Sequence, residues 1–318
     1  MEVNIMLSRV ADGMYWLNRY MERTDGMLLT LNTLYILSFD KETNDYQGYK
    51  PLLEYYTTLS FDKIKEVQYD TNFVLNYIIC DDNNNNSVKN LITKARENAR
   101  GSQDKITKEL WEHINSMYHY INSPDLPKKL ETTKALDILN KLNKDFLLYN
   151  GIIHVTMPRG LGWCFSSIGK HIERCLQTIS MTQAYYAPIN YNLDGNEDLM
   201  YWRKLLLSLS GYEMYMKSYS NIPHNRKVVQ HVIFNKDFAH SVYYTLEYIE
   251  TYLESLLKQN YLNEGRVLQN QFGRLKSYIE FTDYQNLDYQ QLEEVLHNTK
   301  KQLMQFSKDF SKLFFSYT

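Results

Sequence analysis

Residues 14–23 of this chain read MYWLNRYMER, and residues 165–174, which lie 151 positions further on, read FSSIGKHIER. Each segment has a basic residue, two intervening residues and then Glu-Arg. The residues that correspond are Arg19, Glu22 and Arg23 in the first copy and Lys170, Glu173 and Arg174 in the second. A polar signature that occurs twice predicts a duplicated helical scaffold with one composite polar site, but it does not identify a reaction.

Both segments have the periodicity of amphipathic helices. At about 100° per residue, the side chains of Arg19 and Glu22 fall beside Tyr15, while Met14, Leu17, Met21 and Leu28 fall on the opposite face. In the second copy the polar stripe contains Ser166, Lys170 and Glu173, and the apolar stripe contains Phe165, Ile168, Ile172 and Ile179. The two segments therefore share amphipathicity as well as letters.

Two interpretations of these charges remain open. The first is a solvated helix face, on which each basic residue pairs with the Glu three positions later and adds about 0.2–0.5 kcal/mol. The second is burial, which the bulky Tyr15-Trp16 beside the charges favours. A buried Glu22 or Glu173 needs a cationic partner because an unpaired buried charge is costly. Pairing between the two copies would then hold the halves of the molecule together.

Length and composition exclude several classes of protein. The chain has 318 residues, enough for one large domain or two average ones, and a net charge of only −2. A net charge this small creates no overall electrostatic field that would favour binding to nucleic acid or to an anionic membrane. We find neither a signal peptide nor a run of 18 apolar residues, and the three cysteines show no metal or disulfide spacing. We therefore expect a cytoplasmic protein that binds neither nucleic acid nor membranes.

The pattern of apolar residues predicts an all-α fold. Apolar residues recur at helical spacing in long proline-free stretches, for example from Leu246 to Leu257, and no set of alternating strands is found. Predicted breaks lie at residues 83–86, 122–125, 157–160, 188–196 and 220–226, which are rich in Asn, Asp, Ser, Gly and Pro. The halves are predicted as 1–150 and 151–318, either as separate domains or as one interleaved bundle.

A second candidate site lies in the middle of the first half. Arg96 and Arg100 are one helical turn apart with Asn98 between them, and two guanidinium groups on one face suit a carboxylate or phosphate. Gln103 and Thr107 are expected to extend that face. The alternative is an exposed helix whose arginines pair with nearby acidic residues. Trp111 is expected to be a core anchor.

Other familiar chemistry is missing or weak. Glu294 and His297 have the Glu-x-x-His spacing of di-iron bundles, but a second such motif is missing, so no metal site and no cofactor are expected. His171 is expected to be packed or on the surface, and Cys164 and Cys175 to be buried apolar residues. The sequence contains neither a P-loop nor a Gly-x-Ser-x-Gly elbow.

Ordered segments along nearly the whole chain resemble the Alpha-E domain family, a bacterial all-helical family named for its Glu-Arg motif. The segments that match are residues 6–11, 15–16, 19–20, 22–23, 95–100, 109–112, 162–163, 172–174, 202–206 and 210–213, together with Ser87, Gly169 and Ser241. The chain also departs from the family pattern. Lys170 stands where the family has Arg, Leu29 and Ser180 replace an Arg that follows each Glu-Arg, and Ala239-His240-Ser241 replaces Pro-Arg-Ser. Arg and Lys are not equivalent where planar, bidentate contacts matter.

The resemblance implies a fold but no established activity. Members of the family are typically encoded beside, or fused to, ATP-grasp-like amide ligases and transglutaminase-like proteins, which implies a role in making or modifying peptides. One hypothesis is a non-catalytic helical partner of such a ligase or of its peptide, in which Glu22, Arg23, Glu173 and Arg174 hold the scaffold. Arg19, Lys170, Arg96 and Arg100 would then present positive charge to a peptide or small anion.

The alternative hypothesis is an enzyme of peptide or amide chemistry. Glu22 or Glu173 would be the general base in a cleft between the repeats, and the neighbouring cations would stabilise an oxyanion. The first hypothesis is favoured because the sequence shows no nucleophile, metal set or nucleotide loop.

Overall fold

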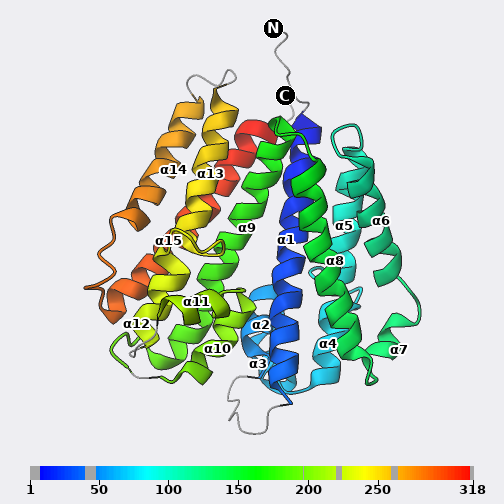
Figure 1. The fold of residues 1–318 in the computed structure, drawn as a ribbon, viewed down its shortest axis with the longest axis horizontal. Coiled ribbons are helices and arrows are strands. Elements are labelled where there is room, and N and C mark those ends of the chain that lie inside the picture. The colour runs from blue at the N-terminus through cyan, green and yellow to red at the C-terminus, as the bar shows by residue number, and fades with distance from the viewer. Residues whose placement is uncertain (1–7, 40–47, 196, 220–223, 259–263, 316–318) are drawn as a thin grey trace. The chain divides into compact units, whose positions relative to one another are not determined.

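The computed structural model describes residues 8–39, 48–195, 197–219, 224–258 and 264–315, and all regular elements among them are helical (Figure 1). The predicted all-α class is therefore confirmed. None of these helices combines the length and apolar character that a membrane span requires. Residues 6–7, 196 and 220–223, which belong to the matching segments or predicted breaks, lie outside the described residues.

The described residues pack into two compact units. The continuous unit is Trp16–Pro158, and the composite unit combines the described parts of Met1–Tyr15 and Arg159–Thr318. Helix α1, Ser8–Leu37, therefore contributes its first two turns to the composite unit and the remainder to the continuous unit. The internal duplication and the division into domains at 1–150 and 151–318 remain predictions.

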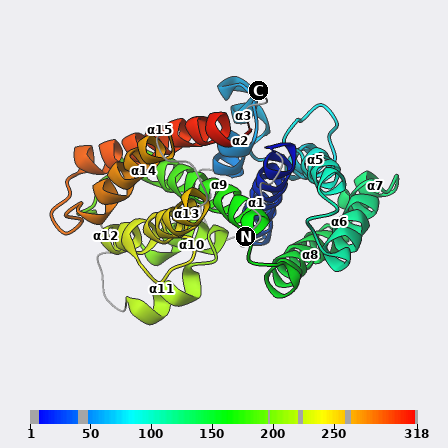
Figure 2. The same ribbon diagram turned by 90° about the horizontal axis from the view of Figure 1, so that it is seen from above.

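In the continuous unit, helix α6 packs against α5 and also against α8 (Figure 2). Thr107 and Thr156 share a hydrogen bond of 2.8 Å that ties the start of α6 to the end of α8. After α1, the helices of this unit are α2 Lys50–Tyr56, α3 Phe61–Val67, α4 Thr71–Ile79, α5 Val88–Gly101, α6 Lys108–Ile121, α7 Leu126–Leu130 and α8 Ala135–Thr156.

The ends of these helices follow from local chemistry. The side chains of Ser87 and Thr107 accept hydrogen bonds from backbone N–H groups in the first turns of α5 and α6, which satisfies donors that a helix leaves open. Helix α8 ends at Thr156, two residues before Pro158, because a proline disfavours helical backbone in the residue that precedes it. The breaks predicted at 83–86, 122–125 and 157–160 are confirmed.

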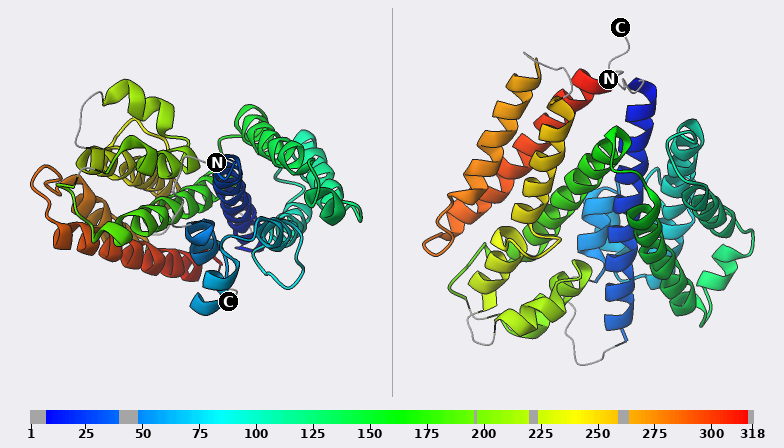
Figure 3. Two further views of the ribbon diagram at one scale, coloured as in Figure 1. Left: turned by 90° about the horizontal axis from the view of Figure 1, so that it is seen from below. Right: turned by 45° about the horizontal axis from the view of Figure 1, so that its top comes forward.

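In the composite unit, α9, α13, α14 and α15 are long helices that lie side by side, and the shorter α10–α12 gather at one end of them (Figures 1 and 3). The break predicted at 220–226 extends too far, because α12 begins at His224. The elements are α9 Leu161–Tyr186, the 3-10 helix η1 Ala187–Ile189, α10 Leu199–Ser208, α11 Tyr212–Ser218, α12 His224–Val229, the π-helix η2 Gln230–Phe234, α13 Val242–Leu257, α14 Glu264–Glu280 and α15 Tyr289–Phe315.

The first turns of α1 are anchored by an aromatic cluster. The Tyr15 ring stacks on Phe310 of α15 at 5.5 Å, and its hydroxyl shares a hydrogen bond of 2.8 Å with Ser307. Phe165 of α9 meets the Phe314 ring edge-on at 5.4 Å. These buried rings contribute both apolar area and favourable ring geometry, and they hold α1 and α9 against α15.

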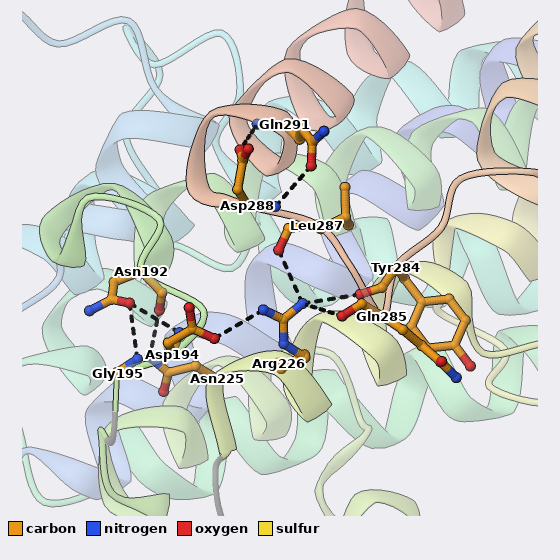
Figure 4. Close-up of polar contacts among 10 residues, drawn as sticks. All are labelled: Asn192, Asp194, Gly195, Asn225, Arg226, Tyr284, Gln285, Leu287, Asp288 and Gln291. Atoms are coloured by element: carbon orange, nitrogen blue, oxygen red, sulfur yellow. Dashed lines mark hydrogen bonds and ion pairs between the residues drawn. The ribbon is translucent and has the colours of Figure 1, made fainter.

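A polar cluster fixes the loops at the opposite end of this unit (Figure 4). The Nη1 atom of Arg226 donates to the carbonyl oxygens of Tyr284, Gln285 and Leu287 at 3.4, 2.9 and 3.1 Å, and its Nη2 donates to Asp194 at 3.0 Å. One guanidinium thereby joins the loop before α15, the loop before α10 and helix α12.

Candidate functional site

The first Glu-Arg motif is built into the interior of the continuous unit. Glu22 is only 5 % exposed. Arg23 donates from Nη2 to the carbonyl oxygen of Tyr55 at 3.4 Å, and its guanidinium carbon lies 5.2 and 5.3 Å from the ring centres of Tyr55 and Tyr56. Such cation–π contacts are stronger when they are removed from water. Arg23 therefore attaches α1 to the last residues of α2.

Helix α8 brings polar groups to the same part of α1. The Tyr149 hydroxyl donates to Oδ1 of Asn18 at 3.0 Å, and the amide of Asn150 donates to Asp25 at 3.3 Å. Burial raises the pKa of Tyr149 well above its ordinary value, and the negative charge of Glu22 raises it further. The phenol therefore stays protonated and serves as a hydrogen-bond donor.

Arg19 belongs to a series of cations and aromatic rings. Its guanidinium carbon lies 5.1 Å from the Trp16 ring centre, and the Trp16 and Tyr20 rings are 5.5 Å apart. On α5, the ammonium of Lys94 lies 5.9 Å from the Tyr20 ring. Because Lys94 lies on α5 and Tyr20 on α1, this series joins the two helices. Arg19 itself is half-buried.

The second Glu-Arg motif is equally buried, with Glu173 at 3 % and Arg174 at 8 % exposure. Nη1 of Arg174 donates to the carbonyl oxygen of Ala239 at 3.3 Å, and the hydroxyl of Thr178 donates to the carbonyl oxygen of His240 at 2.7 Å. Two side chains of α9 thus hold the backbone of the segment that leads into α13. The solvated-face interpretation is wrong for Glu22 and Glu173.

A row of tyrosines on α13 lies beside this motif. Tyr244 and Tyr248 stack with their ring centres 4.4 Å apart, and the His171 ring stacks on Tyr248 at 5.2 Å. Tyr252 lies 6.3 Å from His171. The three tyrosines are half-buried. His171 is packed, as predicted.

His240 lies in the segment that Arg174 and Thr178 hold, and its ring stacks on Phe238 with ring centres 5.9 Å apart. The residue as a whole is half-buried, but its Nδ1 atom is shielded from water and has no hydrogen-bond partner among the residues that the structure describes. Burial holds the pKa of His240 well below its usual range, and the positive charges of Arg174 and Lys170 lower it further. The imidazole is therefore neutral at physiological pH. Lys170 itself is half-buried.

The candidate residues of α5 differ in how far they are exposed to solvent. Arg96 donates from Nε to Asn115 at 2.7 Å, and its guanidinium carbon lies 5.5 Å from the Trp111 ring centre. The side chain of Arg96 is 21 % exposed and that of Arg100 is 64 % exposed, and both contact Glu97. This arrangement fits the alternative of pairing with a nearby acidic residue. Asn98 is half-buried.

Two details of the α5 prediction are wrong. Helix α5 ends at Gly101, so Gln103 and Thr107 do not extend its face, and Thr107 instead caps α6. Trp111 is half-buried beneath Arg96 and is not a core residue.

The thiols are poorly suited to nucleophilic chemistry. Burial raises the pKa of Cys175 to about 12 and that of Cys80 to about 11, and it also raises the pKa of Cys164. The thiolate is the reactive form of cysteine, so all three are protonated at neutral pH. Cys164 and Cys175 are buried, as predicted.

Metal-type clusters of three His, Cys, Asp or Glu side chains are not found within the described residues. Glu294 and His297 both lie exposed on α15. A surface hollow of about 380 Å³ lies beside Asp70, Tyr77 and Glu131, and another of about 330 Å³ lies beside Asp283 and Glu294. Neither hollow is lined by a candidate residue of the Glu-Arg motifs.

Comparison with protein families agrees with this architecture. The model of Alpha-E, a predicted alpha-helical domain with a conserved ER motif, matches residues 6–315. The chain belongs to the Alpha-E family. Searches of curated proteins and of solved structures find no match. The description of Alpha-E names a helical fold and a motif but no reaction, so the function of this Alpha-E domain has to be argued from its own side chains.

Sequence reasoning missed several residues around the second Glu-Arg motif. Tyr244, Tyr248 and Tyr252 follow one another at intervals of four, which places them on one face of a helix. That spacing is visible in the sequence, but the spacing alone does not predict which neighbouring helix the three tyrosines pack against. The sequence marks His240 only as a departure from the family pattern. Its position beside Arg174 follows from hydrogen bonds to the backbone of residues 239 and 240, which the sequence does not display.

Proposed function

We propose that this Alpha-E domain is a non-catalytic helical binding protein in peptide synthesis or modification. Its partner would be an ATP-grasp-type amide ligase, a transglutaminase-like protein, or the peptide on which such an enzyme acts. The observation that carries the proposal is the way in which the arginines of the motif are used. Arg23 and Arg174 both donate to backbone carbonyl oxygens of the chain itself.

This use of the arginines supports a scaffold. A guanidinium that is bonded to a carbonyl and packed on rings has fixed geometry, and it orders the backbone that it contacts. Arg23 orders the end of α2, and Arg174 orders the segment before α13. Glu22 and Glu173, which directly precede these arginines in the sequence, are buried. A buried carboxylate is stable only where it is paired and hydrogen-bonded. We assign Glu22, Arg23, Glu173 and Arg174 to the scaffold.

The remaining cations are better suited to a partner. Lys170 and Arg19 are both half-buried, and Arg19 lies over the Trp16 ring. Arg100 is the most exposed of the α5 candidates, whereas Arg96 is held by Asn115. We assign Arg19, Lys170 and Arg100 to contacts with an acidic or carboxylate-bearing partner. The protonated state of the three thiols supports a role without covalent catalysis.

The proposal is tested by producing the chain together with an ATP-grasp-type ligase that is encoded beside it, and by native mass spectrometry of the mixture. A stoichiometric complex whose ligase turns over faster than the ligase alone is expected. A ligase that neither binds the chain nor changes its rate in the presence of the chain would contradict the proposal.

Substitution of the buried glutamate separates this proposal from the enzyme alternative, in which Glu22 or Glu173 is a general base. We expect Glu173→Gln to lower the free energy of unfolding by about 3 kcal/mol, because it removes one partner of a buried charge. Glu213→Gln, at an exposed position of α11, is the matched control and should change it by less than about 0.5 kcal/mol. If Glu173→Gln keeps full stability but abolishes the activity of the reconstituted pair, Glu173 is catalytic and the scaffold assignment fails.

A further inference from the structure

We propose that the surface hollow beside α4 binds an alkylammonium group, the side chain of a lysine residue in a peptide. The hollow has a volume of about 380 Å³ and lies where α4 meets α7, which are packed neighbours in the continuous unit (Figure 1). That volume lies within the range of sites that hold small ligands. The hollow is not lined by residues of the Glu-Arg motifs, so the inference goes beyond the proposed function and does not depend on it.

The charges on the wall of the hollow are all negative. Asp70 before α4, Asp81 after α4 and Glu131 after α7 line the hollow, whereas lysine, arginine and histidine side chains do not. None of the three carboxylates forms an ion pair within the described part of the chain. Three uncompensated charges of one sign around a concave surface favour the binding of a cation.

Two aromatic rings of α4 form another part of the wall. The Phe73 and Tyr77 rings are stacked with their centres 5.3 Å apart, and both residues are half-buried. Aromatic rings attract cations, and they give the methylene groups of a lysine side chain an apolar surface to pack against. The ammonium of Lys63 on α3 already lies 5.6 Å from the Phe73 ring centre. Lys63 is paired with Glu66 at 2.8 Å and does not line the hollow, so its charge does not balance the carboxylates.

The hydrogen bonds that the carboxylates already make favour an ammonium over a guanidinium. One oxygen of Asp70 and one of Asp81 each accept from a backbone N–H, at 3.0 and 2.7 Å, and Oε1 of Glu131 accepts from the Asn76 amide at 3.3 Å. A guanidinium binds most strongly when it takes both oxygens of one carboxylate. An ammonium has three donors that can reach separate acceptors, and the second oxygen of each carboxylate is suited to one such donor.

The same wall favours a lysine within a peptide over a free diamine. The exposed carboxamide of Asn72 lines the hollow and offers both donors and an acceptor to a peptide backbone. Groups of three His, Cys, Asp or Glu side chains that could hold a metal ion are not found in the described part of the chain. The carboxylates are therefore distributed around the hollow, which suits a side chain with a stem better than a single metal ion.

The test uses isothermal titration calorimetry of the full chain with four small probes. They are Nα-acetyllysine amide, its Nε-acetylated and therefore uncharged form, Nα-acetylarginine amide, and 1,5-diaminopentane. We expect the lysine probe to bind with a dissociation constant at or below about 1 mM and at least about tenfold more tightly than the uncharged form. Equal binding of these two, or no binding of the lysine probe, would overturn the site. Tighter binding of the arginine probe or of the diamine would overturn the assignment to a peptide lysine.

Two variants locate the site. Glu131→Gln keeps an acceptor for Asn76 at an exposed position, and it should weaken the lysine probe about threefold to fivefold through the lost charge. Phe73→Leu should weaken it by a similar factor through the lost ring. Asp104→Asn makes the same charge change at an exposed position between α5 and α6 and should leave binding unchanged. If Asp104→Asn weakens the probe as much as Glu131→Gln does, binding reflects net charge and the assignment to the hollow fails.

Calcium chloride tests the other class of ligand that carboxylates bind. We expect Ca²⁺ to bind the chain no more tightly than the lysine probe does, because the carboxylates do not gather into a metal-type cluster. Tighter binding of Ca²⁺ that is lost in Glu131→Gln would make the hollow a metal site and overturn the proposal. Displacement of the lysine probe by excess unlabelled lysine peptide, with Ca²⁺ absent, is the result that the proposal requires.

Discussion

Among the buried side chains, His231 on the π-helix η2 has an environment that makes the fold sensitive to acid. Its ring is fully buried, stacks on Phe238 at 4.4 Å, and has Nε2 3.2 Å from the carbonyl oxygen of Gly211. Burial lowers the pKa of His231 to about 4, although the hydrogen bond to Gly211 partly opposes that shift. The folded protein therefore holds His231 neutral.

The consequence for stability has a definite sign. An unfolded chain protonates histidine at about pH 6.5, so between pH 6.5 and 4 the unfolded state binds the extra proton. The contribution of His231 is fully present above pH 6.5 and is lost as the pH falls through about 4. We expect it to reach about 3 kcal/mol. Urea unfolding at several pH values measures it.

The variant His231→Phe isolates this contribution from those of other groups. It should flatten the decline in unfolding free energy between pH 6.5 and 4 without abolishing it, because His240 is also held neutral by burial. An unchanged slope in the variant would show that His231 is not the group that titrates.

Tyr15 makes the longest-range side-chain contact described for the composite unit. We expect Tyr15→Phe to lower the free energy of unfolding by about 1 kcal/mol through the lost hydrogen bond to Ser307. Tyr15→Ala should cost about 3–5 kcal/mol because the stack on Phe310 is lost as well. Chemical denaturation of both variants measures the two steps separately. Equal losses in the two variants would contradict the assigned role of the ring.

At the scale of elements, we expect replacement of glycine by alanine to have opposite effects on the free energy of unfolding at two positions. Gly151 lies within α8, and a Cβ atom added there meets nothing within 4 Å. Gly151→Ala should raise the free energy of unfolding by about 0.5–1 kcal/mol because alanine favours the helix. At Gly211, which precedes α11, an added Cβ would lie 2.7 Å from the Phe238 ring. Gly211→Ala should therefore destabilise by about 1–3 kcal/mol. Thermal unfolding of both variants tests the pair, and the same sign in both would contradict it.

The polar cluster around Arg226 makes a further prediction for the loops that connect the elements (Figure 4). Arg226→Gln removes the donors that hold three backbone carbonyls and Asp194. We expect a loss of about 2–3 kcal/mol, since hydrogen bonds from charged groups are the stronger ones. Arg274→Gln on the exposed side of α14 is the control and should stay within about 0.5 kcal/mol. Hydrogen exchange in residues 284–287 should rise in the first variant and not in the second.

Helices and their limits were largely predictable from sequence, because they depend on local chemistry. Apolar spacing predicts α13, and Asn- or Pro-rich segments predict the breaks after α4, α6 and α8. Burial was harder to predict. Tyr15 and Glu22 lie on the stripe that periodicity marks as polar, yet both are buried, because tertiary packing covers that side of α1.

At the scale of the whole molecule, the family and the all-helical class could be predicted, whereas the surroundings of the site could not. The Glu-Arg residues were identified from their repetition, but their partners Tyr55 and Ala239 are 32 and 65 residues away along the chain. Contacts over such separations depend on how helices pack. The packing of Arg96 against Asn115 on α6 was unpredictable for the same reason.

The division of α1 between two units has a consequence for synthesis on the ribosome. The continuous unit is a single run of chain, so all of it is available once Pro158 has left the exit tunnel. The composite unit needs Tyr15 from near the start and Phe310 from near the end. The first turns of α1 are therefore synthesised long before the residues of α15 that they contact. During that interval Met14 and Tyr15 present apolar surface to other nascent chains and to chaperones, so slow translation of the second half of the message would prolong the period of greatest risk of aggregation.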